Sequence, residues 1–174
     1  GMCESRDIHL IMDDIYHQLV FDGVRAVPAW RYGHPDLESS KVIVVNGISK
    51  LYGMTGFRIG WTVASRALVR TMTNVQAQTT SCASPVMQAG AEGALTGQQS
   101  QVESLRLTIQ NNRDVMMREL ASFSGVRCAK PQGTFYCLPD FSAYEKDSVR
   151  LSEFLLRQAR VVTVPGREFG MEGH

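Results

Sequence analysis

Five polar side chains with complementary chemistry occupy two short stretches near the start of the sequence. Asp13 and Tyr16 belong to the first stretch, and Ser49, Lys50 and Arg58 belong to the second. They offer a carboxylate, a phenol, a hydroxyl, a primary amine and a guanidinium group. A lysine amine can form a Schiff base with an aldehyde, and a guanidinium group suits a phosphate because its planar fork donates two hydrogen bonds to one anion.

Pyridoxal phosphate requires these functions in one place. An amine must bind its aldehyde carbon, a carboxylate must keep its ring nitrogen protonated so that the ring accepts electrons, and a cation must hold its phosphate. A phenol beside the ring hydroxyl can tune the protonation of the imine. The residue types are therefore compatible with a site for this cofactor.

Three short apolar runs are predicted to be the strands that position these side chains. They cover residues 8–12, 42–45 and 58–64, and residues 22–41 between the first two have the composition of a loop. Ligands bind beyond the carboxyl ends of parallel strands in open α/β sheets. We therefore expect Asp13 and Lys50 to face one crevice, with Arg58 at the start of the third strand.

The rest of the sequence predicts helices and a smaller α+β module. A helix is expected from about Ser65, and a longer one from Ser100 to about Ser122, where Ser100 and Glu103 form an S-x-x-E capping box. The C-terminal part has strand-like segments, a helical stripe and an apolar run, at residues 125–129, 134–138, 151–155 and 161–164. We expect a large-domain part over residues 1–97, and a bridging helix with a small domain over residues 98–174.

Composition and charge exclude several other classes of protein. The formal net charge is +1, so no broad field favours nucleic acid or an anionic membrane, and neither is expected as a partner. The four cysteines form no CxxC pair and the four histidines lack ligand spacing, so we expect no metal site, no disulfide framework and a cytoplasmic location. No apolar run approaches the roughly 20 residues of a membrane helix.

Several motifs together resemble the class I/II aminotransferases, close to the aspartate and aromatic aminotransferase branch. Asp-Asp-Ile-Tyr at 13–16 is followed by Asn-Gly-Ile-Ser-Lys at 46–50 and by Arg-Ile-Gly-Trp at 58–61. Further matches lie at Gln88, at Pro-Gln-Gly-Thr-Phe-Tyr (131–136) and at Pro-Gly-Arg-Glu-Phe-Gly (165–170). They follow the family's order over nearly the whole chain.

The resemblance implies a role for each residue of the site. Lys50 is the catalytic residue, which binds pyridoxal 5'-phosphate as a Schiff base and moves a proton during amino transfer. Asp13 pairs with the pyridinium nitrogen, Tyr16 with the ring hydroxyl and Arg58 with the phosphate, while Ser49 is a further phosphate donor. The substrates are an amino acid and a 2-oxo acid.

The resemblance also implies a fold and an assembly. The expected fold is α/β: the C-terminal part of a fold-type-I large domain, with an incomplete, mostly parallel sheet, followed by an α+β small domain. The expected assembly is a homodimer. The family's N-terminal half and its arginine for the substrate carboxylate fall outside the matched segments, so we expect a truncated fragment.

Alternatives remain at two levels. Taken singly, Asp13 fits a turn or helix cap, Tyr16 a core aromatic, and Lys50 or Arg58 a solvated surface side chain; their spacing together favours the catalytic interpretation. As a molecule, the chain is either an aminotransferase, a related pyridoxal-phosphate lyase, or an inert fragment that covers its sheet edge by self-association.

Overall fold

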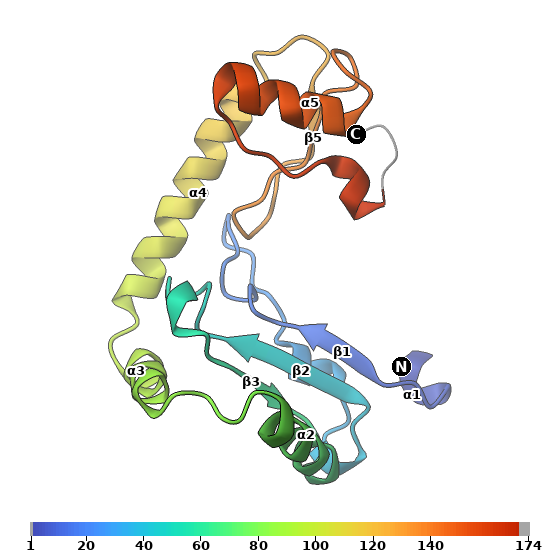
Figure 1. Ribbon diagram of the computed structural model, residues 1–174, viewed down its shortest axis with the longest axis vertical. Helices are drawn as coiled ribbons and strands as arrows, with labels where there is room; N and C mark the ends of the chain where they lie inside the picture. Colours follow the sequence, from blue (N-terminus) through green and yellow to red (C-terminus); the bar gives the residue numbers. More distant parts are fainter. Residues whose placement is uncertain (1, 171–174) are drawn as a thin grey trace. The chain divides into compact units, whose positions relative to one another are not determined.

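The computed structural model describes residues 2–170, and Figure 1 gives the order of their helices and strands. The chain divides into two compact units, the first ending at Leu107 and the second beginning at Thr108. The division falls inside the long helix α4 (Ser100–Leu120). The proposed assignment of residues 1–97 to a cofactor-binding domain and 98–174 to a small domain stays a prediction.

The first unit contains a three-stranded sheet in the order β1-β2-β3. Its strands are β1 (Leu10–Asp13), β2 (Val42–Gly47) and β3 (Gly60–Val63). β1 pairs with β2 in parallel, and β2 pairs with β3 in antiparallel orientation. All three predicted strands are thus present, and β2, which contributes Val42 and Val44 to the core, is the central one.

The long connection between β1 and β2 is irregular, as its composition predicts. It contains two short 3₁₀ turns, Ala29–Tyr32 and Leu37–Ser39, and Ala29 packs with Val42 and Val44 in the core. Leu19 and Phe21 at the start of this connection have no exposed surface. A connection that looks like a surface loop in the sequence therefore supplies part of the core.

Three helices follow the sheet. They are α2 (Arg66–Thr79), α3 (Pro85–Thr96) and α4, and a short helix, α1 (Met2–Ser5), precedes β1. The helices predicted from Ser65 and Ser100 are confirmed, whereas no periodicity in the sequence pointed to α3. Among the described residues, no helix is both long and apolar enough to cross a membrane.

The start of α4 differs from the predicted capping box. The carboxylate of Glu103 is bound by Arg106, with distances of 2.8 Å to Nε and 2.6 Å to an amino nitrogen. The backbone N–H groups of Val102 and Glu103 donate instead to the carbonyl of Gln99. Arg106 also donates to the carbonyl of Val20, so this side chain links α4 to the loop after β1 within the first unit.

The second unit has a small antiparallel pair, β4 (Arg127–Cys128) with β5 (Pro139–Asp140), and the helix α5 (Ser148–Phe154). α5 continues as a π-helical turn at Leu155–Ala159. The predicted strand at 134–138 is wrong, because Thr134 has φ of 62° and an extended strand requires negative φ. Residues 161–164 have no regular structure, although they form an apolar run.

A buried arginine joins α4 to the segment before β5. Arg113 is 4% exposed, donates to the carbonyl of Pro131 at 2.9 Å and pairs with Asp114 at 2.8 Å. Its charge and its donors are therefore satisfied inside the second unit, as a buried guanidinium requires.

Candidate active site at the sheet edge

The ends of three strands bring the predicted site residues to one edge of the sheet. Asp13, the last residue of β1, lies in register with Val45 of β2, and the next backbone N–H, that of Asp14, donates to Val45 at 2.8 Å. β2 ends two residues later at Gly47, which is in register with Gly60 of β3. Because β3 runs in the opposite direction, its first residue lies beside the last residue of β2.

This register places the lysine and the arginine close in the fold. Lys50 follows the end of β2 by three positions, and Arg58 precedes the start of β3 by two. The backbone N–H of Ile48 donates to the carbonyl of Ile59 at 3.4 Å, which extends the ladder to the segment between these residues. Asp13, Lys50 and Arg58 thus emerge at the same edge, as the sequence predicts for this set.

The turn that carries Lys50 is fixed by its own backbone. Gly53 has φ of 63° and donates its N–H to the carbonyl of Lys50 at 3.2 Å. Tyr52 donates in the same way to Ile48 at 3.3 Å. Ser49 and Lys50 are both half-buried in this turn, so the amine is presented from a defined backbone and not from a loose loop.

Arg58 has an unusual backbone conformation. Its φ of 54° lies in the left-handed region, which a residue with a side chain occupies at a cost of about 1–2 kcal/mol. A guanidinium nitrogen donates to the carbonyl of Thr55 at 3.0 Å, and the side chain is otherwise exposed. This backbone conformation sets the direction in which the Arg58 side chain leaves the turn.

The two acidic residues after β1 have different surroundings. Asp13 is exposed, and its Oδ1 accepts from the backbone N–H of Ile15 at 3.3 Å. Asp14 is half-buried, and its Oδ2 accepts from the backbone N–H of Ala29 at 3.2 Å. Tyr16, in the turn that follows, is half-buried. The exposed carboxylate at this edge of the sheet is therefore that of Asp13.

A histidine and an asparagine connect the two loops of the site. Nδ1 of His17 lies 2.9 Å from the carbonyl of Asp14 and 3.4 Å from Nδ2 of Asn46, while Asn46 Oδ1 accepts from the N–H of Gly47 at 2.7 Å. Asn46 belongs to the aminotransferase-like motif at residues 46–50. The contact between His17 and Asn46, which no spacing rule indicates, ties the loop of Tyr16 to the end of β2.

Two glycines allow β2 and β3 to approach closely beside the lysine turn. A Cβ atom on Gly47 would lie 2.8 Å from the carbonyl oxygen of Ile59, and one on Gly60 would lie 2.9 Å from that of Asn46. Both neighbours are backbone atoms, which cannot rotate away. The short spacing between the segments that carry Lys50 and Arg58 therefore depends on the absence of side chains here.

The donor set fits pyridoxal phosphate chemically: an amine, a carboxylate, a phenol and a guanidinium group lie at one sheet edge. A hollow of about 280 Å³ between the sheet and α2 is not lined by these residues, and its polar lining comes from Asn46, Thr62, Thr73 and Gln76. Within residues 2–170 we find no group of three histidine, cysteine or acidic side chains that would hold a metal ion.

Comparisons with known proteins agree with this arrangement. The sequence model of the family "Aminotransferase class I and II" matches residues 2–174. A probable aspartate/prephenate aminotransferase from Rickettsia prowazekii is 36% identical over 97% of the chain, and an aspartate aminotransferase from Rhizobium meliloti is 34% identical over 94%. The chain covers 44% and 42% of these two proteins, so it spans less than half of their length.

Solved structures show the same likeness. The crystal structure of the Rhizobium meliloti aspartate aminotransferase matches 98% of the chain with a TM-score of 0.87 and 32% identity, and the chain covers 44% of it. An aromatic aminotransferase from Pyrococcus horikoshii matches 99% with a TM-score of 0.87 and 29% identity, with 46% of that protein covered. The fold is thus part of the fold-type-I aminotransferase fold, and the chain belongs to the class I and II aminotransferase family.

Proposed function

We propose that this chain carries the lysine-bearing part of a pyridoxal-phosphate-dependent aminotransferase, which transfers an amino group from an L-amino acid to a 2-oxo acid. The observation that supports this most directly is the strand register that brings Asp13, Lys50 and Arg58 to one sheet edge. Relatives named for aspartate, prephenate and aromatic substrates make L-aspartate the first amino donor to test.

Each residue has a task that its chemistry allows. Lys50 would hold the cofactor through its aldehyde carbon and would move the proton at the α-carbon of the substrate. The carboxylate of Asp13 would hold the ring nitrogen, the Tyr16 hydroxyl the ring oxygen, and Arg58 and Ser49 the phosphate. When bound, the cofactor would supply an electron sink.

The binding of the cofactor can be tested on the chain itself. Pyridoxal phosphate is added, the bond to lysine is reduced with borohydride, and the labelled lysine is located by mass spectrometry. We expect the label on Lys50 in the parent and its loss in Lys50→Ala, whereas Lys146→Ala, which removes an exposed lysine, keeps it. Equal labelling of Lys50 and Lys146 would show adventitious reaction and would contradict the proposal.

The type of reaction needs a second measurement. With L-aspartate and 2-oxoglutarate, an aminotransferase forms glutamate and consumes the 2-oxo acid, whereas a lyase releases ammonia and leaves the 2-oxo acid untouched. We expect glutamate. Ammonia release without glutamate would favour the related lyase.

A second candidate is an inert fragment that self-associates, and one observation favours it. Ile11 on the edge strand β1 is 68% exposed, although its run is typical of a buried strand. An exposed apolar edge strand pairs readily with another chain. We expect Ile11→Lys to reduce self-association in sedimentation experiments and Val86→Lys, on α3, to leave it unchanged. Association without any labelling of Lys50 would support the inert fragment.

The working assembly and location are further parts of the proposal. The exposed apolar surface supports a homodimer as the active unit, since such surface is common at subunit interfaces. All four cysteines are free, and this supports a reducing compartment such as the cytoplasm.

A further inference from the structure

A glutamine at the junction of α3 and α4 binds the turn that carries Lys50. The hydroxyl of Tyr52, two residues after Lys50, donates to Oε1 of Gln99 at 3.0 Å. Nε2 of the same glutamine donates to the carbonyls of Ala94 and Gly97 at 3.1 and 2.8 Å. Two carbonyl oxygens require the amide nitrogen on their side, so the amide oxygen must face Tyr52. These contacts together define one orientation of the Gln99 side chain.

Helix α3 lies against the next part of the same loop. A Cβ atom on Gly90 would lie 2.6 Å from Cε1 of Phe57 and 3.7 Å from the methyl carbon of Met54, so both side chains pack against the helix backbone. Both are half-buried. Phe57 ends the 3₁₀ turn Thr55–Phe57 and directly precedes Arg58, whose backbone is left-handed. The packing of Phe57 on α3 therefore fixes the segment from which the Arg58 side chain leaves.

The loop between β2 and β3 is thus supported at two points outside the sheet. The hydrogen bond to Gln99 supports its lysine end, and the packing on Gly90 supports its arginine end. Beyond the two strands, the bond from the N–H of Ile48 to the carbonyl of Ile59 extends the ladder to the base of this loop. The residues farther out depend on contacts of another kind, and α3 with the start of α4 provides them.

We propose that Tyr52, Gln99 and Gly90 are positioning residues for the cofactor, an inference that rests on the proposed roles of Lys50 and Arg58. The hydrogen bond between Tyr52 and Gln99 holds the lysine end of the loop and so places the amine. The contact at Gly90 holds the arginine end and so places the guanidinium group for a phosphate. Helix α3 thereby has a task at the site, although no predicted ligand of the cofactor lies on it.

Two reagents separate the two ends of the loop. Pyridoxal and pyridoxal phosphate both react with a lysine amine, but only pyridoxal phosphate offers an anion to a guanidinium group. Each is titrated onto the whole chain and trapped with borohydride, and mass spectrometry gives its Kd for Lys50. A change at the lysine end should weaken both reagents to the same degree, whereas a change at the arginine end should weaken pyridoxal phosphate alone.

Tyr52→Phe and Gln99→Leu test the lysine end. Each removes one side of the same hydrogen bond, so we expect the affinity of Lys50 for either reagent to fall about fivefold. The double variant should bind no more weakly than Gln99→Leu alone. Gln98→Leu, at an exposed neighbour, is the control. Hydrogen exchange without any cofactor gives a second measurement: the amides of Tyr52 and Gly53 should exchange faster in the two variants than in the control.

Gly90→Ala tests the arginine end, with Gly93→Ala on the same helix as its control. Both variants gain the helix propensity of alanine. Nothing lies within 4 Å of a Cβ atom on Gly93, whereas a Cβ atom on Gly90 would meet the ring of Phe57 at 2.6 Å. The ring must move, and Arg58 is its direct neighbour. We expect Gly90→Ala to weaken pyridoxal phosphate about tenfold, as for the loss of a charge-assisted hydrogen bond, and to leave pyridoxal unchanged.

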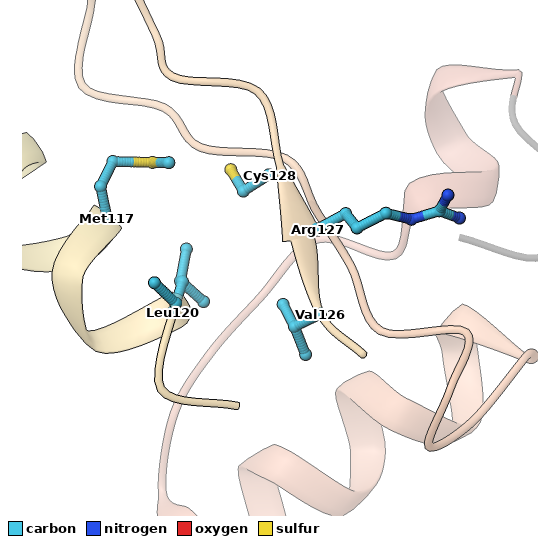
Figure 2. A pocket seen from close by; sticks show the side chains of 6 residues that line it. Met117, Leu120, Val126, Arg127 and Cys128 are labelled. Carbon is cyan, nitrogen blue, oxygen red and sulfur yellow. The ribbon is translucent and has the colours of Figure 1, made fainter. Parts of the chain in front are cut away.

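A hollow in the second unit provides a control for binding elsewhere. Its volume is about 310 Å³, and its lining consists of Met117, Leu120, Ala121, Val126, Arg127 and Cys128. Figure 2 shows the Arg127 side chain extending away from Leu120, and its guanidinium group pairs with Asp140 at 2.9 Å. A phosphate bound at this hollow would depend on Arg127. Arg127→Gln should therefore leave the reaction of both reagents with Lys50 unchanged.

The parent chain and the variants distinguish the two ways of failing. If Lys50 of the parent is labelled but Gln99→Leu behaves like Gln98→Leu, or Gly90→Ala like Gly93→Ala, the positioning role is overturned and the proposed function stands. If Lys50 of the parent reacts no better than Lys146, the proposed function fails, and the positioning role fails with it. Far-UV circular dichroism verifies folding. Should Gln99→Leu not fold, Tyr52→Phe alone decides, because it removes a single hydroxyl group.

Discussion

The carboxylate of Asp14 accepts a hydrogen bond from the backbone N–H of Ala29 at 3.2 Å, and Ala29 is buried in the core. Its neighbour Asp13 is exposed at the end of β1. The two adjacent acidic residues therefore have different roles, because Asp14 holds a loop to the core and Asp13 faces the sheet edge.

Asp14→Ala should change the stability of the protein, whereas Asp13→Ala should change its reaction with the cofactor. Loss of the Asp14 hydrogen bond should lower the free energy of unfolding by about 1 kcal/mol, measured by urea denaturation. Asp13→Ala should change it by less than about 0.5 kcal/mol but reduce labelling of Lys50 by pyridoxal phosphate at least tenfold. The reverse pattern would exchange the roles assigned to the two acids.

Arg58→Asn should weaken binding of the cofactor without lowering the stability of the protein. Asparagine tolerates the left-handed backbone better than arginine, so the free energy of unfolding should stay the same or rise by up to about 1 kcal/mol. Cofactor affinity should fall at least tenfold, because the phosphate loses its bidentate donor. Arg70→Gln on the exposed face of α2 removes the same charge and serves as the control. Equal losses of affinity in both variants would mean that only net charge matters.

Gly47→Ala should disturb the site through the sheet. The added Cβ would meet the backbone oxygen of Ile59 at 2.8 Å, so β2 and β3 must separate beside the lysine turn. We expect the free energy of unfolding to fall by about 1–3 kcal/mol and the labelling of Lys50 to decrease. Gly56→Ala is the matched control, since nothing lies within 4 Å of its added Cβ. A Tm for Gly47→Ala equal to that of Gly56→Ala would contradict the close approach of the strands.

The alkylation of Cys137 should depend on pH in a direction set by its surroundings. Its pKa is raised first by burial and then by Cys128, and only the thiolate reacts with iodoacetamide. Labelling should therefore remain slow where an ordinary thiol, with pKa of about 8.5, already reacts, and should accelerate at higher pH. Cys128→Ala removes the neighbouring charge, so the midpoint should move to lower pH. A midpoint that does not move would show that burial acts alone.

The site residues could be read from the sequence because their chemistry and order are local properties. Lys50 and Arg58 stand eight positions apart around a turn, and Asp13 directly follows an apolar run. Short motifs of this kind can be recognised without knowledge of the fold. They also pointed to the family that the comparisons show. The roles of the individual residues remain predictions to be tested.

Other features depended on long-range packing that no local pattern encodes. Part of the loop predicted at residues 22–41 lies in the core, because Ala29 packs with Val42 and Val44. Helix α3 was not predicted, because its apolar and small residues do not form a clear stripe on one side. The strand expected at 134–138 is absent, because Thr134 has a positive φ that an extended strand does not allow.

The sequence by itself determined the chemistry of this protein: an amine, a carboxylate, a phenol and a guanidinium group in a fixed order, on short apolar strands. Only the tertiary structure showed what the neighbouring acid does, because the hydrogen bond from the Ala29 N–H to Asp14 joins residues that are far apart in the sequence.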